Sequence, residues 1–265
     1  MTRLRRAALC CAAALLLTGC SGAPDTSDYP VLASAVAAAN EAGNKQVSFL
    51  MQFTFGKEKT TMLFAQGEYT VGTENGYALS GKMAQTVLGA SVTVEFCYAD
   101  GWYGYVLDGN AIRREQTEES LRSGFLFSDA FLFDESDVTS MTRSSGDAGS
   151  GIYELKIGGD HTARLVELLG EDIYALSQLS KPDKSKTQAT DLVCGYTVAA
   201  DGRLTGRTLS YTLSLYDTPP YVPGVEPDYE DYHLELQITM RMQYAYDGVQ
   251  PPELPDMNEY ETVSG

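Results

Sequence analysis

The chain has 265 residues, with 19 basic and 36 acidic side chains and a formal net charge of −17. Binding to a nucleic-acid backbone depends on clustered Lys and Arg, so this charge argues against nucleic acid as a partner. Hydrophobic residues make up 43% of the chain and aromatic residues 10%, which is enough to build a core and argues against disorder.

The first 19 residues have the pattern of a signal peptide. Arg3, Arg5 and Arg6 form a basic start, and the apolar run from Ala7 to Leu17 is too short for a membrane-spanning helix. Removal of these three arginines leaves 16 basic and 36 acidic residues, a formal charge of −20. No later stretch of the sequence approaches the roughly 18 apolar residues that a second span needs.

The signal ends at Leu17-Thr18-Gly19-Cys20, which resembles the lipobox of bacterial lipoproteins. This resemblance implies cleavage before Cys20 and a diacylglyceryl group on its sulfur, which would anchor the protein in the cell membrane on the extracytoplasmic side. The alternative is an ordinary secretory signal with an incidental cysteine. Residues 20–28 are small, polar and contain proline, so we expect a flexible tether that holds the domain within roughly 26 Å of the membrane.

Two cysteines remain for the folded domain. Cys10 and Cys11 leave with the signal and Cys20 is expected to carry lipid, so Cys97 and Cys194 are left in a compartment that permits disulfides. Cys194 shares a strand face with apolar residues, whereas Cys97 lies opposite its apolar neighbours. A disulfide between them and two buried free thiols therefore both stay open. A redox pair is not expected, because there is no Cys-x-x-Cys motif.

The predicted elements begin with a helix that starts after Asp28 and stops near Gly43. The hydrophobic period then changes from 3.6 to 2, which predicts strands joined by short turns, and hence an antiparallel meander. The strands predicted in this half of the chain cover residues 47–55, 60–71, 77–87, 92–98 and 102–107.

The second half begins with a short helix from Thr117 and two Phe-rich clusters, at 125–127 and 131–133. Asp160 caps a second helix, which Gly170 bends or divides. Pro251 and the prolines that follow it are expected to end regular structure. The strands predicted in this half cover residues 138–143, 152–157, 191–199, 204–215 and 232–246.

About ten strands and two main helices predict one α+β domain over residues 29–250, with a Pro-rich acidic tail over 251–265. A flat sheet of ten strands would be roughly 48 Å wide. Two helices, each about 10 Å across, would leave much of its apolar face exposed. We therefore expect a single antiparallel sheet curled into an open or half barrel, with the helices on its concave face.

This order of elements resembles the LolA-like superfamily, which includes periplasmic lipoprotein carriers and lipid-binding lipoproteins. The segments Tyr98-Ala-Asp-Gly-Trp102-Tyr103 and Ala200-Asp-Gly-Arg-Leu204 are similar to turns often seen there. The resemblance covers most of residues 29–250 and implies an incomplete barrel whose helical lid shelters acyl chains. It transfers no catalytic residues, and some relatives act as sensors.

Motifs for catalysis are absent from the sequence. His161 and His233 have no partner at a metal-ligand spacing, and there is no nucleophile elbow, P-loop or dinucleotide fingerprint. We therefore expect no enzyme, no metal and no cofactor. The acidic loop over residues 217–231 suits either calcium or a basic protein partner, or a stiff, solvated connector.

Met and aromatic residues at inward positions are the best candidates for lining a ligand pocket, and they suit a plain core equally well. They are Phe49, Met51, Phe53, Phe55, Met62, Phe64, Met83, Met240, Met242 and Tyr244. The lid is predicted from Leu121, Phe125, Phe127 and Phe131. Our first hypothesis is a monomeric, anchored lipoprotein that binds a lipid or another apolar ligand. The alternative is an interaction or sensor module with a filled core.

Overall fold

The computed structural model describes residues 24–56, 60–74, 76–124, 127, 132–170, 172–220, 226 and 228–263. In the first half, the strands are β1 (Lys45–Phe55), β2 (Thr60–Gly72), β3 (Ala78–Val87), β4 (Ala90–Ala99), β5 (Trp102–Leu107) and β6 (Asn110–Glu115). In the second half, they are β7 (Val138–Ser145), β8 (Gly151–Ile157), β9 (Gln188–Val198), β10 (Leu204–Tyr216), β11 (His233–Ala245) and β12 (Glu261–Thr262).

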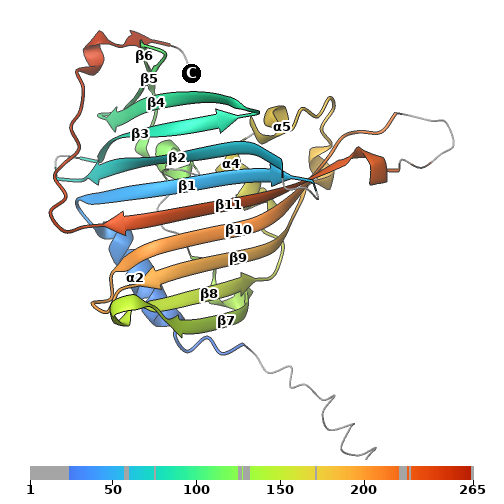
Figure 1. Cartoon of the computed structure of the whole chain (residues 1–265), viewed down its shortest axis with the longest axis horizontal. Coiled ribbons are helices and arrows are strands. Elements are labelled where there is room, and N and C mark those ends of the chain that lie inside the picture. Colours follow the sequence, from blue (N-terminus) through green and yellow to red (C-terminus); the bar gives the residue numbers. More distant parts are fainter. Residues whose placement is uncertain are drawn as a thin grey trace, which may run out of the picture.

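These strands form one curled sheet in the order β12-β6-β5-β4-β3-β2-β1-β11-β10-β9-β8-β7 (Figure 1). The two ends of this order do not pair with each other among the described residues, so the sheet stays unclosed. The predicted α+β fold with a single curled sheet is confirmed. The sheet has two strands more than predicted, β6 and β12, and β12 makes it mixed because it runs parallel to β6.

The helices lie behind the sheet in Figure 1. They are α2 (Tyr29–Glu41), α3 (Glu118–Ser123), α4 (Thr162–Leu169) and α5 (Asp172–Leu176). Short 3-10 helices are η1 (Glu135–Asp137), η2 (Asp147–Gly149), η3 (Lys184–Lys186), η4 (Glu230–Tyr232) and η5 (Met257–Glu259). Gly170 divides the second predicted helix, because its φ of 75° is a left-handed conformation that ends α4.

The pairing of β1 with β11 joins the two halves of the sheet. Phe49 lies beside Met242, Met51 beside Met240, and Phe53 beside Ile238. All of these side chains point to the inner face, which carries the core and the helices, and at most 9% of each is exposed. Alternate residues point to the opposite, outer face. Each inward side chain of this size stabilises the fold by about 1.5–3 kcal/mol when it is fully buried.

Helix α2 packs on the inner face against β9 and β10. Its apolar stripe of Leu32, Ala35, Val36 and Ala39 is buried. The Lys45 ammonium group donates a hydrogen bond to the Ala39 carbonyl oxygen at 2.8 Å. A cation at the C-terminal end of a helix meets free carbonyls and the negative end of the helix dipole, so Lys45 fixes α2 to the start of β1.

The C-terminal segment continues beyond its prolines into regular structure, contrary to the sequence prediction. It runs past the ends of several strands and pairs as β12 with β6 (Figure 1). The segment docks because Gly104 leaves room for it. A Cβ atom at Gly104 would lie only 3.0–3.1 Å from atoms of Tyr260, Cys97 and Met257. Proline stops strand pairing locally, but it does not prevent the chain after it from packing on the sheet.

Cys97 and Cys194 are both free and buried, so the structure decides against the disulfide. Cys194 belongs to the inner core, whereas the Cys97 sulfur lies 3.6 Å from the Met257 sulfur under the C-terminal segment. The two side chains occupy opposite faces of the sheet, as their strand positions indicated. Burial raises the pKa of both thiols, that of Cys194 to about 12, so both stay protonated at neutral pH.

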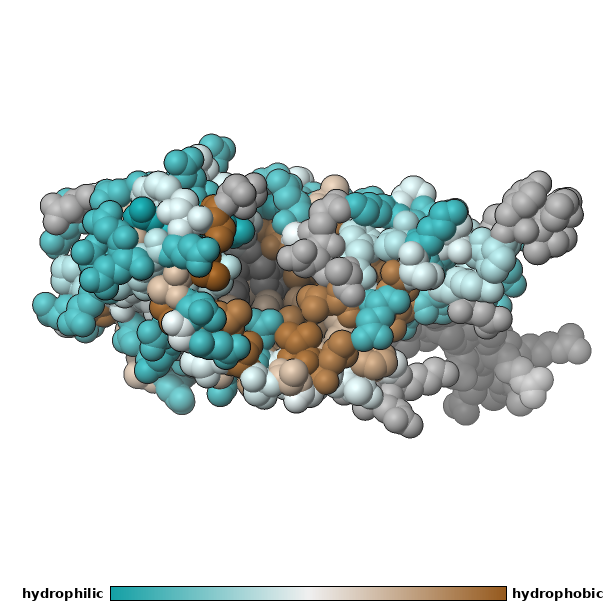
Figure 2. All heavy atoms as spheres, turned by 90° about the horizontal axis from the view of Figure 1, so that it is seen from above, coloured by the Kyte–Doolittle hydropathy of each residue, from teal (hydrophilic) through white to brown (hydrophobic). Residues whose placement is uncertain are grey.

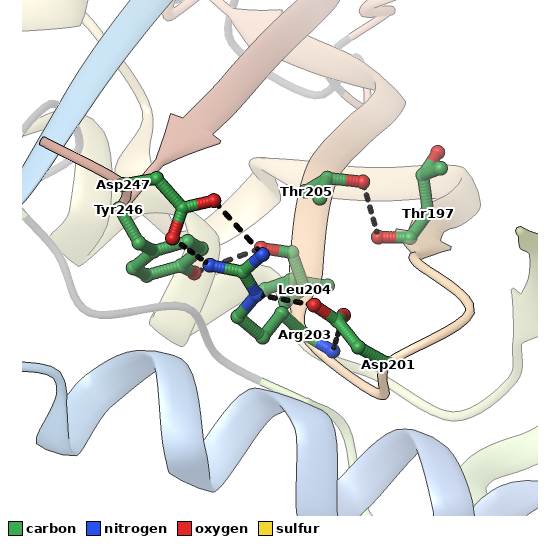
Figure 3. A network of polar contacts seen from close by, with 7 residues as sticks. All are labelled: Thr197, Asp201, Arg203, Leu204, Thr205, Tyr246 and Asp247. Atoms are coloured by element: carbon green, nitrogen blue, oxygen red, sulfur yellow. Dashed lines mark hydrogen bonds and ion pairs between the residues drawn. The ribbon is translucent and has the colours of Figure 1, made fainter.

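Arg203 links the β9–β10 turn to the start of the C-terminal segment (Figure 3). Its guanidinium makes two hydrogen bonds to the Asp247 carboxylate, at 2.7 and 3.0 Å, and one to Asp201 at 2.7 Å. The Tyr246 hydroxyl donates to the Leu204 carbonyl oxygen at 2.8 Å. Hydrogen bonds from Arg203 lower the pKa values of both carboxyls, through its backbone N–H first at Asp201 and through its side chain at Asp247.

This network predicts a pH dependence of stability. Because both aspartate pKa values are lower in the folded state, their stabilisation is present above the unfolded value of about 3.9 and is lost as the pH falls through the folded values. We expect Arg203→Gln to lower the melting temperature at neutral pH, and we expect this difference to shrink below about pH 4. Thermal melts followed by circular dichroism test this, and a difference that is constant with pH would contradict it.

Candidate ligand cavity

A cavity of about 380 Å³ lies on the inner face, between the sheet and helices α3, α4 and α5. Seen from above, Figure 2 shows the molecule hollowed in its middle, with hydrophobic side chains beside the hollow. The apolar side chains that line the cavity are Met51, Phe53, Leu63, Tyr103, Leu121, Phe127, Leu168, Leu169 and Leu176. Its polar lining side chains are Arg114, Gln116, Ser120 and Glu167.

Two short helices are held in place at this cavity by local signals. The Thr117 hydroxyl oxygen accepts a hydrogen bond from the Ser120 N–H at 3.1 Å and so caps α3. This orients Leu121 inward, where only 2% of it is exposed. The turn at Gly170 separates α4 from α5, and Leu169 and Leu176, one from each helix, line the same cavity.

The polar side chains lie at the solvent-exposed rim. Arg114, Ser120 and Glu167 are exposed, and the Arg114 guanidinium donates to the Gln116 amide oxygen at 3.3 Å. The same guanidinium lies 5.5 Å from the centre of the Tyr103 ring, a cation–π contact. Burial raises the pKa of Tyr103 to about 12, so its hydroxyl is neutral at physiological pH. The cavity is thus apolar inside and polar at its rim.

An aromatic cluster closes one side of the cavity. The Phe127 ring centre lies 5.2 Å from that of Phe96, 5.5 Å from that of Tyr69 and 6.1 Å from that of Tyr103. The pairs with Phe96 and Tyr69 are edge-on, the geometry that the aromatic quadrupole favours. Phe127 therefore connects the predicted lid to strands β2, β4 and β5.

The structure brings only part of the predicted ligand-lining set to the cavity. Met51 and Phe53 line it, as do Leu121 and Phe127 of the predicted lid. Phe125 and Phe131 lie outside the described residues. The remaining inward residues fill the core, where Phe49, Met62, Met240, Met242 and Tyr244 are buried and Phe55 and Met83 pack against them half-buried.

The inward assignment of Phe64 is wrong, and a β-bulge is the reason. Phe53 pairs with Leu63, but the next residue of β1, Thr54, pairs with Thr61, so Met62 is an extra residue in β2. An extra residue reverses the alternation of the strand. Leu63 therefore faces the core with 4% of it exposed, and Phe64 lies on the outer face beside Gln52.

Sequence reasoning missed several lining residues. Leu63 was hidden by the bulge, and Tyr103 was noted only as part of a turn motif. Arg114 lies in β6 and Gln116 follows it, and β6 was not predicted because it is short and rich in charged residues. Leu169 and Leu176 could have been predicted as lining residues, since they lie on the apolar stripe of the second predicted helix.

Described residues of the other candidate sites make contacts within the fold. The Asp217 carboxylate, at the start of the acidic loop, accepts hydrogen bonds from the Ser180 N–H and hydroxyl and from the Lys181 N–H. His161 packs its ring against Phe133, and His233 stacks on Tyr216.

Within the described part of the chain, no group of three or more His, Cys, Asp or Glu side chains could hold a metal ion. In that same part, every helix is too short or too polar to cross a membrane.

No family model and no curated protein matches this sequence. Among solved structures, LprF from Mycobacterium bovis is similar, with 10% identity, a TM-score of 0.48 and coverage of 88% of this chain and 99% of LprF. A LolA superfamily protein from Nitrosomonas europaea has 11% identity and a TM-score of 0.26, covering 86% and 94% of the two chains. A DUF1329 family protein from Desulfovibrio piger has 10% identity and a TM-score of 0.29, covering 86% and 96%. At these values we carry no function over from these proteins.

The bulge in β2 gives a prediction about two adjacent residues. Leu63→Ala should lower the free energy of unfolding by about 2 kcal/mol or more, because it empties a buried position. Phe64→Ala should cost less than about 1 kcal/mol, because its side chain lies on the outer face. Urea denaturation of both variants measures this. A larger cost for Phe64→Ala than for Leu63→Ala would show that the strand alternates as the sequence predicted.

Proposed function

We propose that this protein is a membrane-anchored, extracytoplasmic lipoprotein that binds a lipid or another apolar molecule without transforming it. The observation that carries this proposal is the cavity with apolar walls from the sheet and three helices, and with Arg114, Gln116, Ser120 and Glu167 at its rim. An apolar interior with a few polar groups at the entrance suits an amphiphile, whose chain is buried and whose head group stays in water.

The size of the cavity narrows the ligand class. Its volume of about 380 Å³ lies near the lower end of the range of about 300–1,000 Å³ for small-molecule sites. This favours a single acyl chain over a bulky lipid with several chains. Each methylene that leaves water for the cavity contributes about 0.8 kcal/mol, so a chain of moderate length gives binding without specific polar contacts.

The contacts of the N-terminal residues limit how far the domain could stand from a membrane in which Cys20 is anchored. The Asp28 carboxylate forms an ion pair with Arg143 at 3.3 Å, and the Tyr29 hydroxyl donates to the Phe133 carbonyl oxygen. Thr26 donates to the Glu135 carboxylate. Residues from 26 onward are therefore held by the domain, which leaves five residues between Cys20 and Thr26. These span at most roughly 17 Å, which is shorter than the tether that the sequence predicted.

The second candidate function is an interaction or sensor module, and the filled core favours it. Met240, Met242 and Tyr244 were candidates for a large pocket, but they pack into the core with 1–8% of each exposed. In that case the small cavity on the inner face would be a packing defect, and the protein would act through its surface.

Ligand binding can be tested by filling the cavity. The half-buried Leu168 lines it from α4, and Leu168→Trp places an indole ring in the space of the ligand. We expect this variant to bind a fluorescent fatty acid at least tenfold more weakly than the wild type. Native mass spectrometry of the purified protein should find a co-purified amphiphile in the wild type and less of it in Leu168→Trp.

Val31→Trp is the matched control, because Val31 lies on a helix but 51% of it is exposed. It should bind like the wild type. A wild-type protein that is empty after purification and binds no fatty acid would favour the interaction module. Unchanged binding by Leu168→Trp would place the ligand elsewhere.

The anchor has its own test. Cys20→Ser should move the protein from the membrane fraction to the soluble fraction, because two acyl chains give stable anchoring and the strongly acidic domain is repelled by anionic lipid. Cys97→Ser is the control, and it should stay with the membranes. Immunoblots of fractionated cells measure both. Membrane association of Cys20→Ser would rule out lipidation at this residue.

A further inference from the structure

The outer face of the sheet carries a second set of hollows, opposite the inner cavity. One, of about 580 Å³, is bordered by side chains from five neighbouring strands, among them Ser48, Gln66, Thr93, Arg241 and Gln243. Another, of about 930 Å³, lies between the sheet and the C-terminal segment and includes Pro251, Pro252 and Tyr260. Glu68 and Lys82 belong to both hollows, so together they form one elongated groove.

Arg241 is the unusual residue in this groove. From Asp217 to the end, the sequence has eleven acidic residues and one basic residue, which is Arg241. In the register of the sheet it lies beside Leu50 on β1 and Thr208 on β10, and its outward neighbours along β11 are Thr239 and Gln243. These neighbours are all neutral. Among the described residues, no carboxylate is in contact with its guanidinium.

The other cation of the groove is already paired. Lys82 lies 3.6 Å from the Glu68 carboxylate, which also accepts a hydrogen bond from the Gln46 amide. Within the described part of the chain, the Arg241 guanidinium at one end of the groove therefore has no carboxylate partner, although the charge of −17 means that carboxylates are plentiful. A guanidinium presents several N–H groups in one plane and binds a carboxylate or a phosphate with two parallel hydrogen bonds.

Beside Arg241, the first hollow offers neutral hydrogen-bonding side chains, whereas the hollow under the C-terminal segment also carries the carboxylates Glu95, Asp247 and Glu253. Ser48, Gln66, Thr93 and Gln243 each combine donors and acceptors, which suits the hydroxyl groups of a sugar. A peptide would bind a sheet mainly through backbone pairing at an edge. A peptide cannot add to the sheet as a further strand at this place, because β1, β2 and β3 are paired with neighbouring strands on both sides. Ligands on this face must be bound through side chains.

We propose that the outer groove binds an acidic carbohydrate. The carboxylate or phosphate of the sugar binds Arg241, and the hydroxyl groups of the sugar bind the amide and hydroxyl side chains beside Arg241. The sugar lies within the first hollow, between Arg241 and Lys82, because Glu95, Asp247 and Glu253 border the second hollow and would repel an acidic chain. This site is independent of the inner cavity, since it lies on the other side of the sheet and uses none of the residues that line that cavity.

Calorimetric titration of the purified full chain tests the site with three sugars of equal length. Tetragalacturonate carries carboxylates, a phosphorylated maltotetraose carries phosphate, and maltotetraose is neutral. We expect one or both acidic sugars to bind. The sugar that binds more tightly shows whether the site prefers a carboxylate or a phosphate. Arg241→Gln should bind them roughly tenfold to a hundredfold more weakly, which is the usual effect of losing a hydrogen-bonded charge. Higher salt should weaken binding to the wild type.

Arg143→Gln makes the same change of charge on an exposed arginine of β7, which lies far from the groove in the strand order, and it should bind like the wild type. Gln243→Ala should weaken binding of each acidic sugar without removing the preference for charge. The melting temperature of Arg241→Gln should equal that of the wild type, because the Arg241 guanidinium forms no hydrogen bond or ion pair with any residue that the structure describes. The proposal is overturned if no acidic sugar binds at millimolar concentration, if Arg241→Gln binds like the wild type, or if an acidic tetrapeptide binds where the sugars do not.

Discussion

The fold depends on one long-range pairing, that of β1 near the N-terminus with β11 near the C-terminus. Each half of the chain forms its own antiparallel series of strands, and this pair joins them into a single sheet. A single sheet buries only one apolar face, so the sheet must curl around the few helices that cover it. The inner side chains of β1 and β11 are the centre of that buried face, and the positions of helices, cavity and outer groove all follow from it.

The curl gives the two faces of the sheet different chemistry. Large apolar side chains fill the inner face beneath α2, whereas the region between β1, β2 and helices α3 to α5 keeps an open space. The outer face carries amide, hydroxyl and charged side chains from the alternate positions of the same strands. The inner cavity suits a ligand that avoids water, whereas the outer groove suits one that is rich in hydroxyl groups.

Much of the fold could be predicted from hydrophobic period and turn residues, because these signals act within a few residues of each other. β11 alternates without interruption, and Asp201-Gly202 and Asp100-Gly101 mark turns whose positive φ angles favour such residues. The prediction failed where alternation breaks, as at the bulge in β2 that turns Phe64 outward. It also failed where a short charged strand or a Pro-rich segment finds its partner far away, as at β6 and β12.

By itself, the sequence determined the class of fold, the face on which most side chains lie, and an interruption of the second helix at Gly170, as a bend or a division. Local propensity and alternation are enough for these features. Only the tertiary structure decided which inward residues fill the core and which line a cavity, because that depends on how far the helices reach across the sheet. It also decided that Cys97 and Cys194 stay apart, and that Arg241 has neutral neighbours and no carboxylate partner among the described residues. Those facts depend on residues that are distant in sequence and adjacent only after the sheet has formed.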